Sequence, residues 1–312
     1  MDYIMEAELL NYETQINMLK EAAYNSYVDE SLLTEEFSIK KAWDAFVKWI
    51  KEKVGPVIKA MFNWCKKTIN FEKKKDKEAK EDVDFILKYQ NQMRNAYAGN
   101  FIGKKKIIYY SIDSLSNENL SDLFIKKSLM PLKIYLQDLK KMSFMFNSIK
   151  GMTDEELKKK KEEYSKHQEE MNKLKIDNIE NCFRKVELDD SFLLKDTSFI
   201  ELSIDRISAD KDGIESCESN ICDINNVYYS TQKIVSELDR NLGEFQDNQI
   251  RNAITWGNML IKESIDLGAI NKTCMELYKK DKDYQYMFLK QVKALMKEAL
   301  DRGESVAVPD FA

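Results

Sequence analysis

Residues that make tight turns are scarce in this sequence. Its 312 residues include only 9 Gly and 3 Pro. A fold of many short strands needs frequent Gly and Pro turns, whereas long helices need few. Hydrophobic residues make up 43% of the chain and charged residues 33%, which is enough to give helices a buried face and a solvated face. The sequence therefore predicts a mainly α protein built from one or more multi-helix bundles.

The clearest helical pattern lies in residues 38–69. Its apolar residues step by three or four and hold phase throughout: Ile39, Trp43, Phe46, Ile50, Val54, Val57, Met61, Cys65 and Ile69. Gly55-Pro56 interrupts the pattern without resetting it, which predicts a kinked helix or two helices meeting end to end. The segment contains eight Lys and only two acidic residues, which gives it a local net charge of +6 in a chain of net charge −5.

The apolar face of this segment is the best candidate for contact with a partner or a membrane. Its candidate contact residues are Trp43, Phe46, Trp49, Ile50, Val57, Met61 and Trp64. Interfacial Trp with lysines on the opposite side suits a helix lying on an anionic membrane. The same pattern describes a long helix packed on a core. We favour packing within the protein or its assembly, because amphipathic core helices are common.

Charge and periodicity divide the chain into consecutive segments. These are a helical arm at 1–70, a charged linker at 71–82, a central helical region with a minor strand at 83–208, a helical bundle at 209–303 and an extended tail at 304–312. The mixed charges of the linker are equally compatible with a solvated helix extension. The apolar tail residues Val306, Val308 and Phe311 could dock on a neighbouring subunit or shell, or pack on their own domain.

Within these segments, small β elements are expected near 105–112 and 198–204. Residues 106–112 are β-branched and aromatic, whereas Ile200, Leu202 and Ile204 alternate like a strand but also fit a helix with Ile207. Three helices are expected in the C-terminal region, at about 223–243, 248–279 and 283–302. Thr153 and Glu156 fit a capping box that starts another helix.

No catalytic, cofactor-binding or metal-binding constellation is assembled in the sequence. His167 is the only histidine, which removes histidine-based triads and most catalytic zinc sites. Residues 208–213 are similar to a calcium loop, but two of the required carboxylates are missing, so a capped turn is expected there. The five Cys have no metal-binding or disulfide spacing. A non-enzymatic protein without cofactors, and without a secretory signal, is the expectation.

The layout of roughly the first 80 residues resembles the internal head proteins of tailed bacteriophages that infect AT-rich Gram-positive hosts. An acidic helix with Glu6, Glu8, Glu13 and Glu21 precedes the Trp- and Lys-rich stretch 41–50, and a charged run and a helical body follow. The resemblance implies a structural protein inside the virion head, made in the host cytoplasm and present as a homo-oligomer. It implies contact with the major capsid protein or other virion proteins, and weak contact with packaged DNA.

The resemblance leaves one alternative open. The protein could instead be a membrane-active ejection or pore-forming protein that inserts residues 38–69 or lays them on the bilayer. The sequence does not choose between a protein that lines the shell and one that leaves with the genome.

Overall fold

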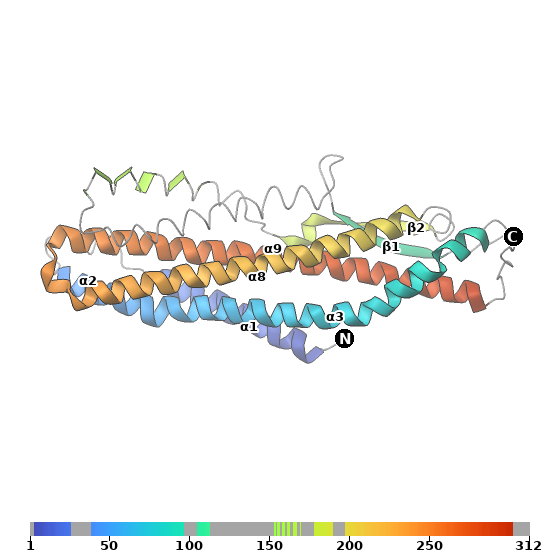
Figure 1. The fold of residues 1–312 in the computed structure, drawn as a ribbon, viewed down its shortest axis with the longest axis horizontal. Coiled ribbons are helices and arrows are strands. Elements are labelled where there is room, and N and C mark those ends of the chain that lie inside the picture. Colours follow the sequence, from blue (N-terminus) through green and yellow to red (C-terminus); the bar gives the residue numbers. More distant parts are fainter. Residues whose placement is uncertain are drawn as a thin grey trace. The chain divides into compact units, whose positions relative to one another are not determined.

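The computed structural model describes residues 3–25, 39–96, 105–112, 178–189 and 197–301, together with scattered positions between 153 and 169. Its elements, in chain order, are α1 (Tyr3–Asn25), α2 (Ile39–Trp49), the π-helical turn η2 (Ile50–Val54), α3 (Gly55–Ala96), β1 (Lys106–Ile112), the 3₁₀ turn η6 (Ile179–Cys182), β2 (Phe183–Asp189), α8 (Ser198–Arg240), the 3₁₀ turn η7 (Leu242–Glu244) and α9 (Asp247–Asp301) (Figure 1). The predicted mainly α fold with a small β element is confirmed.

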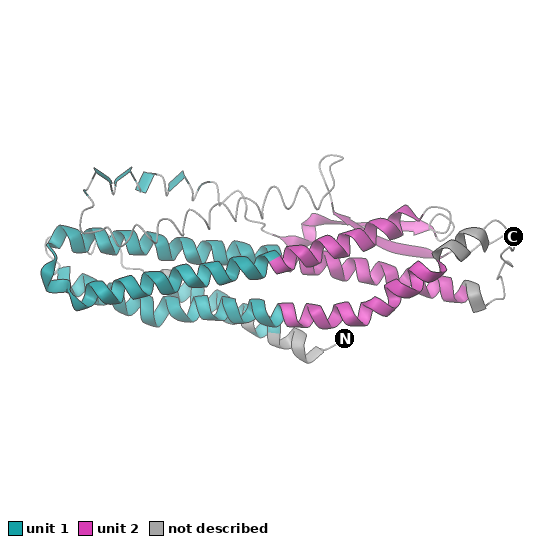
Figure 2. Cartoon of the chain, viewed as in Figure 1, with its two compact units in different colours: residues 1–68, 126–175, 216–274 teal, residues 69–125, 176–215, 275–312 magenta. Residues whose placement is uncertain are grey.

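The chain forms two compact units, each built from segments far apart in the sequence (Figure 2). Unit 1 comprises residues 1–68, 126–175 and 216–274, and unit 2 comprises residues 69–125, 176–215 and 275–312. The helices α3, α8 and α9 contribute residues to both units. The consecutive segments expected from the sequence differ from this division, because periodicity does not show where a long helix changes from one core to another.

The interruption at Gly55-Pro56 takes the form of a π turn. The N–H of Gly55 donates to the carbonyl of Ile50, five residues earlier. Pro56 has no N–H and its ring collides with the carbonyl four residues before it in a regular α-helix, so a widened turn at this point accommodates it. A side chain at Gly55 would place its Cβ 2.7 Å from the Tyr228 hydroxyl, which explains the glycine.

The charged run at 71–82 is helical throughout. It lies inside α3, which continues from Gly55 to Ala96. The helix-extension reading of this run is therefore correct, and the reading as a linker is wrong. The helix predicted at about 82–97 is the final part of the same element.

The predicted break between residues 279 and 283 is also wrong. α9 is one helix of 55 residues, from Asp247 to Asp301. The intervening Lys280-Asp281-Lys282 contains no helix breaker, and Asp281 and Lys282 are buried, with exposed fractions of 3% and 0%. Ion pairs described below allow these charged residues to continue the buried face of the helix.

The strand at 106–112 is confirmed as β1, but its predicted companion at 198–204 is not a strand. β1 pairs antiparallel with β2, at 183–189. Residues 198–204 instead begin α8, where the carbonyl of Thr197 accepts from the N–H of Ile200 at 2.9 Å. Ile200 is buried and Leu202 is 41% exposed. The two residues therefore do not share one buried face, as the strand-like alternation had suggested.

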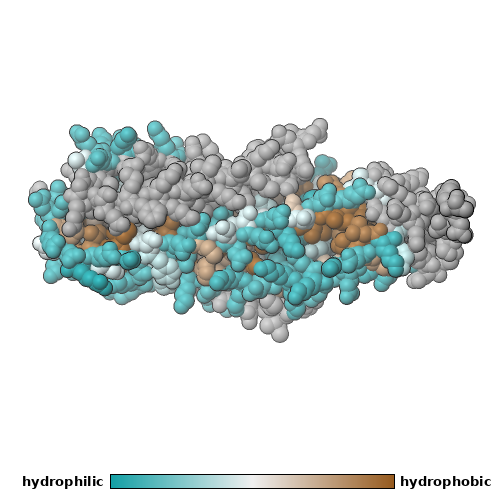
Figure 3. All heavy atoms as spheres, viewed as in Figure 1, coloured by the Kyte–Doolittle hydropathy of each residue, from teal (hydrophilic) through white to brown (hydrophobic). Residues whose placement is uncertain are grey.

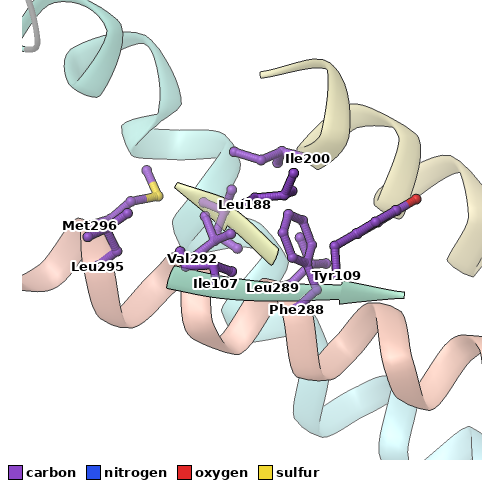
Figure 4. Packing of buried hydrophobic residues seen from close by; sticks show 10 residues of the cluster. Ile107, Tyr109, Leu188, Ile200, Phe288, Leu289, Val292, Leu295 and Met296 are labelled. Carbon is purple, nitrogen blue, oxygen red and sulfur yellow. The ribbon is translucent and has the colours of Figure 1, made fainter. Parts of the chain in front are cut away.

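The core of unit 2 lies between this small sheet and parts of the helices. Figure 4 shows Ile107 and Tyr109 of β1 and Leu188 of β2 facing Ile200 of α8 and a row of α9 residues. That row comprises Phe288, Leu289, Val292, Leu295 and Met296. Ile86 of α3 completes the cluster. The sheet therefore covers one face of the helices of its own unit.

Several sequence predictions fall wholly or partly outside the described residues. These are the helix at 118–149, the environment of His167 and the tail with Val306, Val308 and Phe311. The capping box at Thr153 is confirmed. The Thr153 N–H donates to Glu156 Oε2 at 2.8 Å, and the Glu156 N–H donates to Thr153 Oγ1 at 3.2 Å.

Candidate functional site

The seven residues predicted for partner or membrane contact lie in the core of unit 1. Their exposed fractions range from 0% to 4%: Trp43 0%, Phe46 0%, Trp49 4%, Ile50 1%, Val57 0%, Met61 1% and Trp64 2%. The lysines predicted on the opposite side of the helix, such as Lys48 and Lys59, are exposed. In this conformation the apolar face is a packing surface within unit 1, and contact with a partner or lipid would require the unit to open.

Two of the three tryptophans on this apolar face form hydrogen bonds inside the unit. The indole N–H of Trp43 donates to Asp239 of α8 at 2.7 Å, and the indole N–H of Trp49 donates to the carbonyl of Ala23 in α1 at 2.9 Å. Because a buried indole N–H without a partner is costly, each bond favours one placement of α2 against its neighbours.

Unit 2 contains a second unusual feature, a buried cluster of charged side chains that we call the ionic cluster. Its first half surrounds Lys282, which is 0% exposed. The ammonium of Lys282 lies 2.6 Å from Glu72 and 2.7 Å from Asp76, both on α3. Tyr286 donates its hydroxyl to Asp76 at 2.9 Å. One turn of α9 is thereby tied to one turn of α3 within the unit.

The protonation of this half follows from burial and pairing. Burial raises the pKa of Glu72, an effect that Lys282 opposes. On Lys282 burial acts in the opposite direction, yet its pKa is raised because Glu72 and Asp76 stabilise the ammonium. Burial and the Asp76 carboxylate also raise the pKa of Tyr286, which keeps that hydroxyl a donor.

The second half of the ionic cluster surrounds Arg206 of α8. Its guanidinium donates to both carboxylate oxygens of Asp281, with the Nε to Oδ2 distance at 3.1 Å. The remaining nitrogen, Nη1, donates to the Tyr109 hydroxyl at 2.8 Å and to the Tyr110 carbonyl at 3.1 Å. Gln285 donates to Asp281 at 2.9 Å. A single arginine thus joins α8, α9 and β1.

Asp210 adds a second carboxyl group to this half. It lies one helical turn after Arg206, is 6% exposed and shares a hydrogen bond with Asp281. Burial and the neighbouring Asp281 carboxylate raise the pKa of Asp210 well above its ordinary value. Burial also raises the pKa of Asp281, but Arg206 acts against this. Burial therefore favours the protonated form of Asp210, whereas Arg206 favours the charged form of Asp281.

Sequence reasoning missed the ionic cluster because it assigns charged residues to solvated faces by default. Residues 208–213 were expected to form a capped turn similar to a calcium loop. They are instead helical, and Gly213 is required by Tyr278, whose ring would lie 2.5 Å from an added Cβ. A usable signal existed in α9, where Asp281, Lys282 and Gln285 occupy positions that continue the apolar stripe of Tyr278 and Phe288.

The ionic cluster is suited to holding the helices of unit 2 in register. Its charged groups face one another, and the described residues contain no group of His, Cys, Asp or Glu side chains arranged to hold a metal ion. Burial raises the pKa of the Cys274 thiol to about 12, which disfavours its reactive thiolate form. We therefore expect these buried ion pairs to fix one arrangement of the helices more than to add stability.

The chain has no match among known protein families, curated proteins or solved structures. Among the described residues, no helix combines the length and apolar character needed to cross a bilayer.

Proposed function

We propose that this protein is a non-enzymatic structural component of the interior of a tailed-phage head, bound to the inner face of the shell through its helical surfaces. The observation that supports a structural role is that the two most unusual groups of side chains are buried within their own units. The Trp face of unit 1 and the ionic cluster of unit 2 both serve packing. The placement in a phage head rests on the resemblance of the first 80 residues.

The surface is compatible with such a role. Hydrophilic residues occupy most of the described surface in Figure 3, with smaller hydrophobic areas between them. The net charge of −5 weakens attraction to packaged DNA. A protein that coats the inside of a shell without holding the genome back needs this property, because DNA affinity grows with the number of phosphates neutralised.

Mass spectrometry of purified virions tests this proposal. Particles of a phage that encodes the chain would be treated with protease and nuclease before disruption, so that only protected proteins remain. We expect the chain among the protected proteins, in many copies. Its absence from intact particles would end the proposal, and its digestion in intact particles would place it on the outside.

The membrane-active alternative is supported by the Trp and Lys pattern of residues 38–69. It requires unit 1 to release side chains that are now at most 4% exposed, and to break the bonds from Trp43 to Asp239 and from Trp49 to Ala23. Leakage of anionic vesicles caused by the full chain, and abolished by Trp43→Ala with Trp49→Ala, would support it over the structural role.

A further inference from the structure

The small sheet of unit 2 has two outer edges, and they differ. In the antiparallel register of β1 and β2, Ile108 faces Glu187 and Tyr110 faces Lys185. In an antiparallel pair of strands, two facing residues both point their backbone N–H and C=O groups toward the other strand, or both point them away. These two kinds of facing pair alternate along the strands. The hydrogen bonds that side chains form with β1 show which kind of pair these residues belong to.

Side chains from the helices bond to the outer edge of β1. Gln291 accepts from the N–H of Ile108 at 3.0 Å and donates to its carbonyl at 3.1 Å. The Tyr110 carbonyl accepts from Arg206 at 3.1 Å and from Gln285 at 3.4 Å. The backbone groups of Ile108 and Tyr110 therefore point away from β2, and this edge of the sheet is closed.

The outer edge of β2 has no partner strand among the described residues. Because Lys185 and Glu187 face Tyr110 and Ile108, their backbone N–H and C=O groups point away from β1. Within the described part of unit 2, nothing bonds to these backbone groups. The side chains of Lys185 and Glu187 are 51% and 50% exposed, so this edge is accessible to another strand.

We propose that this edge of β2 pairs antiparallel with the same edge of a second copy of the chain, about a two-fold axis at Val186. In this register Lys185 of each copy faces Glu187 of the other, so two pairs of opposite charge form. The facing residues are also those whose backbone groups point outward, so they can exchange both hydrogen bonds. Charge and backbone direction thus select the same arrangement.

Other registers along this edge are less favourable. A parallel pairing in register would oppose Lys185 to Lys185 and Glu187 to Glu187, and like charges directly opposite one another are destabilising. An antiparallel shift that centres the axis on Leu188 would oppose Glu187 to Asp189, again with like charges. A lysine on an exposed edge strand normally discourages pairing. Here Lys185 discourages the wrong pairings and favours one self-pairing.

Self-association through this edge of β2 does not depend on where the protein resides. Its failure would leave the proposed location in the phage head standing. The edge contact is short, so the pairing is expected to be reversible and to depend on salt.

Sedimentation of the full chain over a range of concentrations tests the pairing. We expect a dimer that dissociates on dilution and that Glu187→Lys weakens roughly tenfold, since both opposite-charge contacts become repulsive. Lys185→Glu should weaken it similarly. The double exchange, Lys185→Glu with Glu187→Lys, should restore most of the affinity. Glu237→Lys is the matched control, because Glu237 is a 55% exposed partner of Lys233 on α8.

Hydrogen exchange with residue resolution provides the second readout. The amides of Lys185 and Glu187 should gain protection as concentration rises, whereas those of Val186 and Leu188, which bond to β1, should be protected at every concentration. A chain that stays monomeric at every concentration overturns the inference. So does a dimer that Glu187→Lys weakens no more than Glu237→Lys, or one in which the amides of Lys185 and Glu187 stay unprotected.

Discussion

Arg206 and Asp281 form a buried, bidentate ion pair that joins α8 to α9 inside unit 2. Two guanidinium nitrogens donate to the two carboxylate oxygens, and the side chains are 8% and 5% exposed. Paired hydrogen bonds of this kind fix orientation as well as distance. Because removing both charges from water costs several kcal/mol, we expect the pair to contribute more to the choice of one helix register than to net stability.

Arg206→Met should destabilise the protein by about 3–5 kcal/mol, because it leaves the charge of Asp281 buried and unpaired. Urea unfolding at neutral pH measures the loss. Lys233→Met is the matched control, since Lys233 is 79% exposed and lies 4.0 Å from Glu237. That change should cost less than about 0.5 kcal/mol.

Removing both partners separates the two contributions. Arg206→Met with Asp281→Leu should recover most of the stability lost in the single variant, because no unpaired charge remains. If the double variant remains as far below the wild type in stability as Arg206→Met, the ion pair contributes net stability, and its role is not mainly to fix the register of the helices.

The stability of the protein should fall as rising pH removes the proton from Asp210. The pKa of Asp210 in the folded protein is raised above its ordinary value of 3.8 by burial and by Asp281. Stability from the bound proton is therefore fully present below about pH 4 and is lost as pH rises through the folded pKa. Within that window, each pH unit should cost about 1.4 kcal/mol.

Asp210→Asn isolates this contribution, because its amide can donate to Asp281 at any pH as the protonated carboxyl does. Urea unfolding of both proteins between pH 5 and 8 gives the difference in stability. The variant should become progressively more stable than the wild type as pH rises. A constant difference across this range would show that Asp210 is already ionised in the folded protein.

Gly213→Ala should destabilise the protein even though alanine favours a helix by about 1 kcal/mol. An added Cβ would lie 2.5 Å from the Tyr278 ring, and a buried ring cannot move aside cheaply. Overpacking costs about 1–3 kcal/mol, so a net loss is expected in thermal or urea unfolding. Gly243→Ala is the control, because nothing lies within 4 Å of its added Cβ. Equal stability of the two variants would contradict the close approach of Tyr278.

The features that could be predicted from the sequence are those encoded by neighbouring residues. The amphipathic stripe of 38–69 and the β-branched run of β1 each express a local period, and both were located correctly. The ionic cluster could not be predicted in this way. Arg206 and Asp281 are separated by 75 positions, and Lys282 and Asp76 by 206. Such charges look solvated until the fold brings their partners together.

Tryptophan fluorescence can test whether the Trp face of residues 38–69 points into the core of unit 1. All four tryptophans are buried, with exposed fractions of 0% for Trp43, 4% for Trp49, 2% for Trp64 and 0% for Trp256. Acrylamide should therefore quench the full chain severalfold less than the urea-unfolded chain, and anionic vesicles should leave the emission unchanged. Trp49→Phe, which leaves the Ala23 carbonyl without its indole donor, should destabilise the protein by about 1 kcal/mol. A vesicle-dependent change in emission that Trp43→Phe and Trp49→Phe together remove would show that unit 1 opens and that residues 38–69 reach lipid.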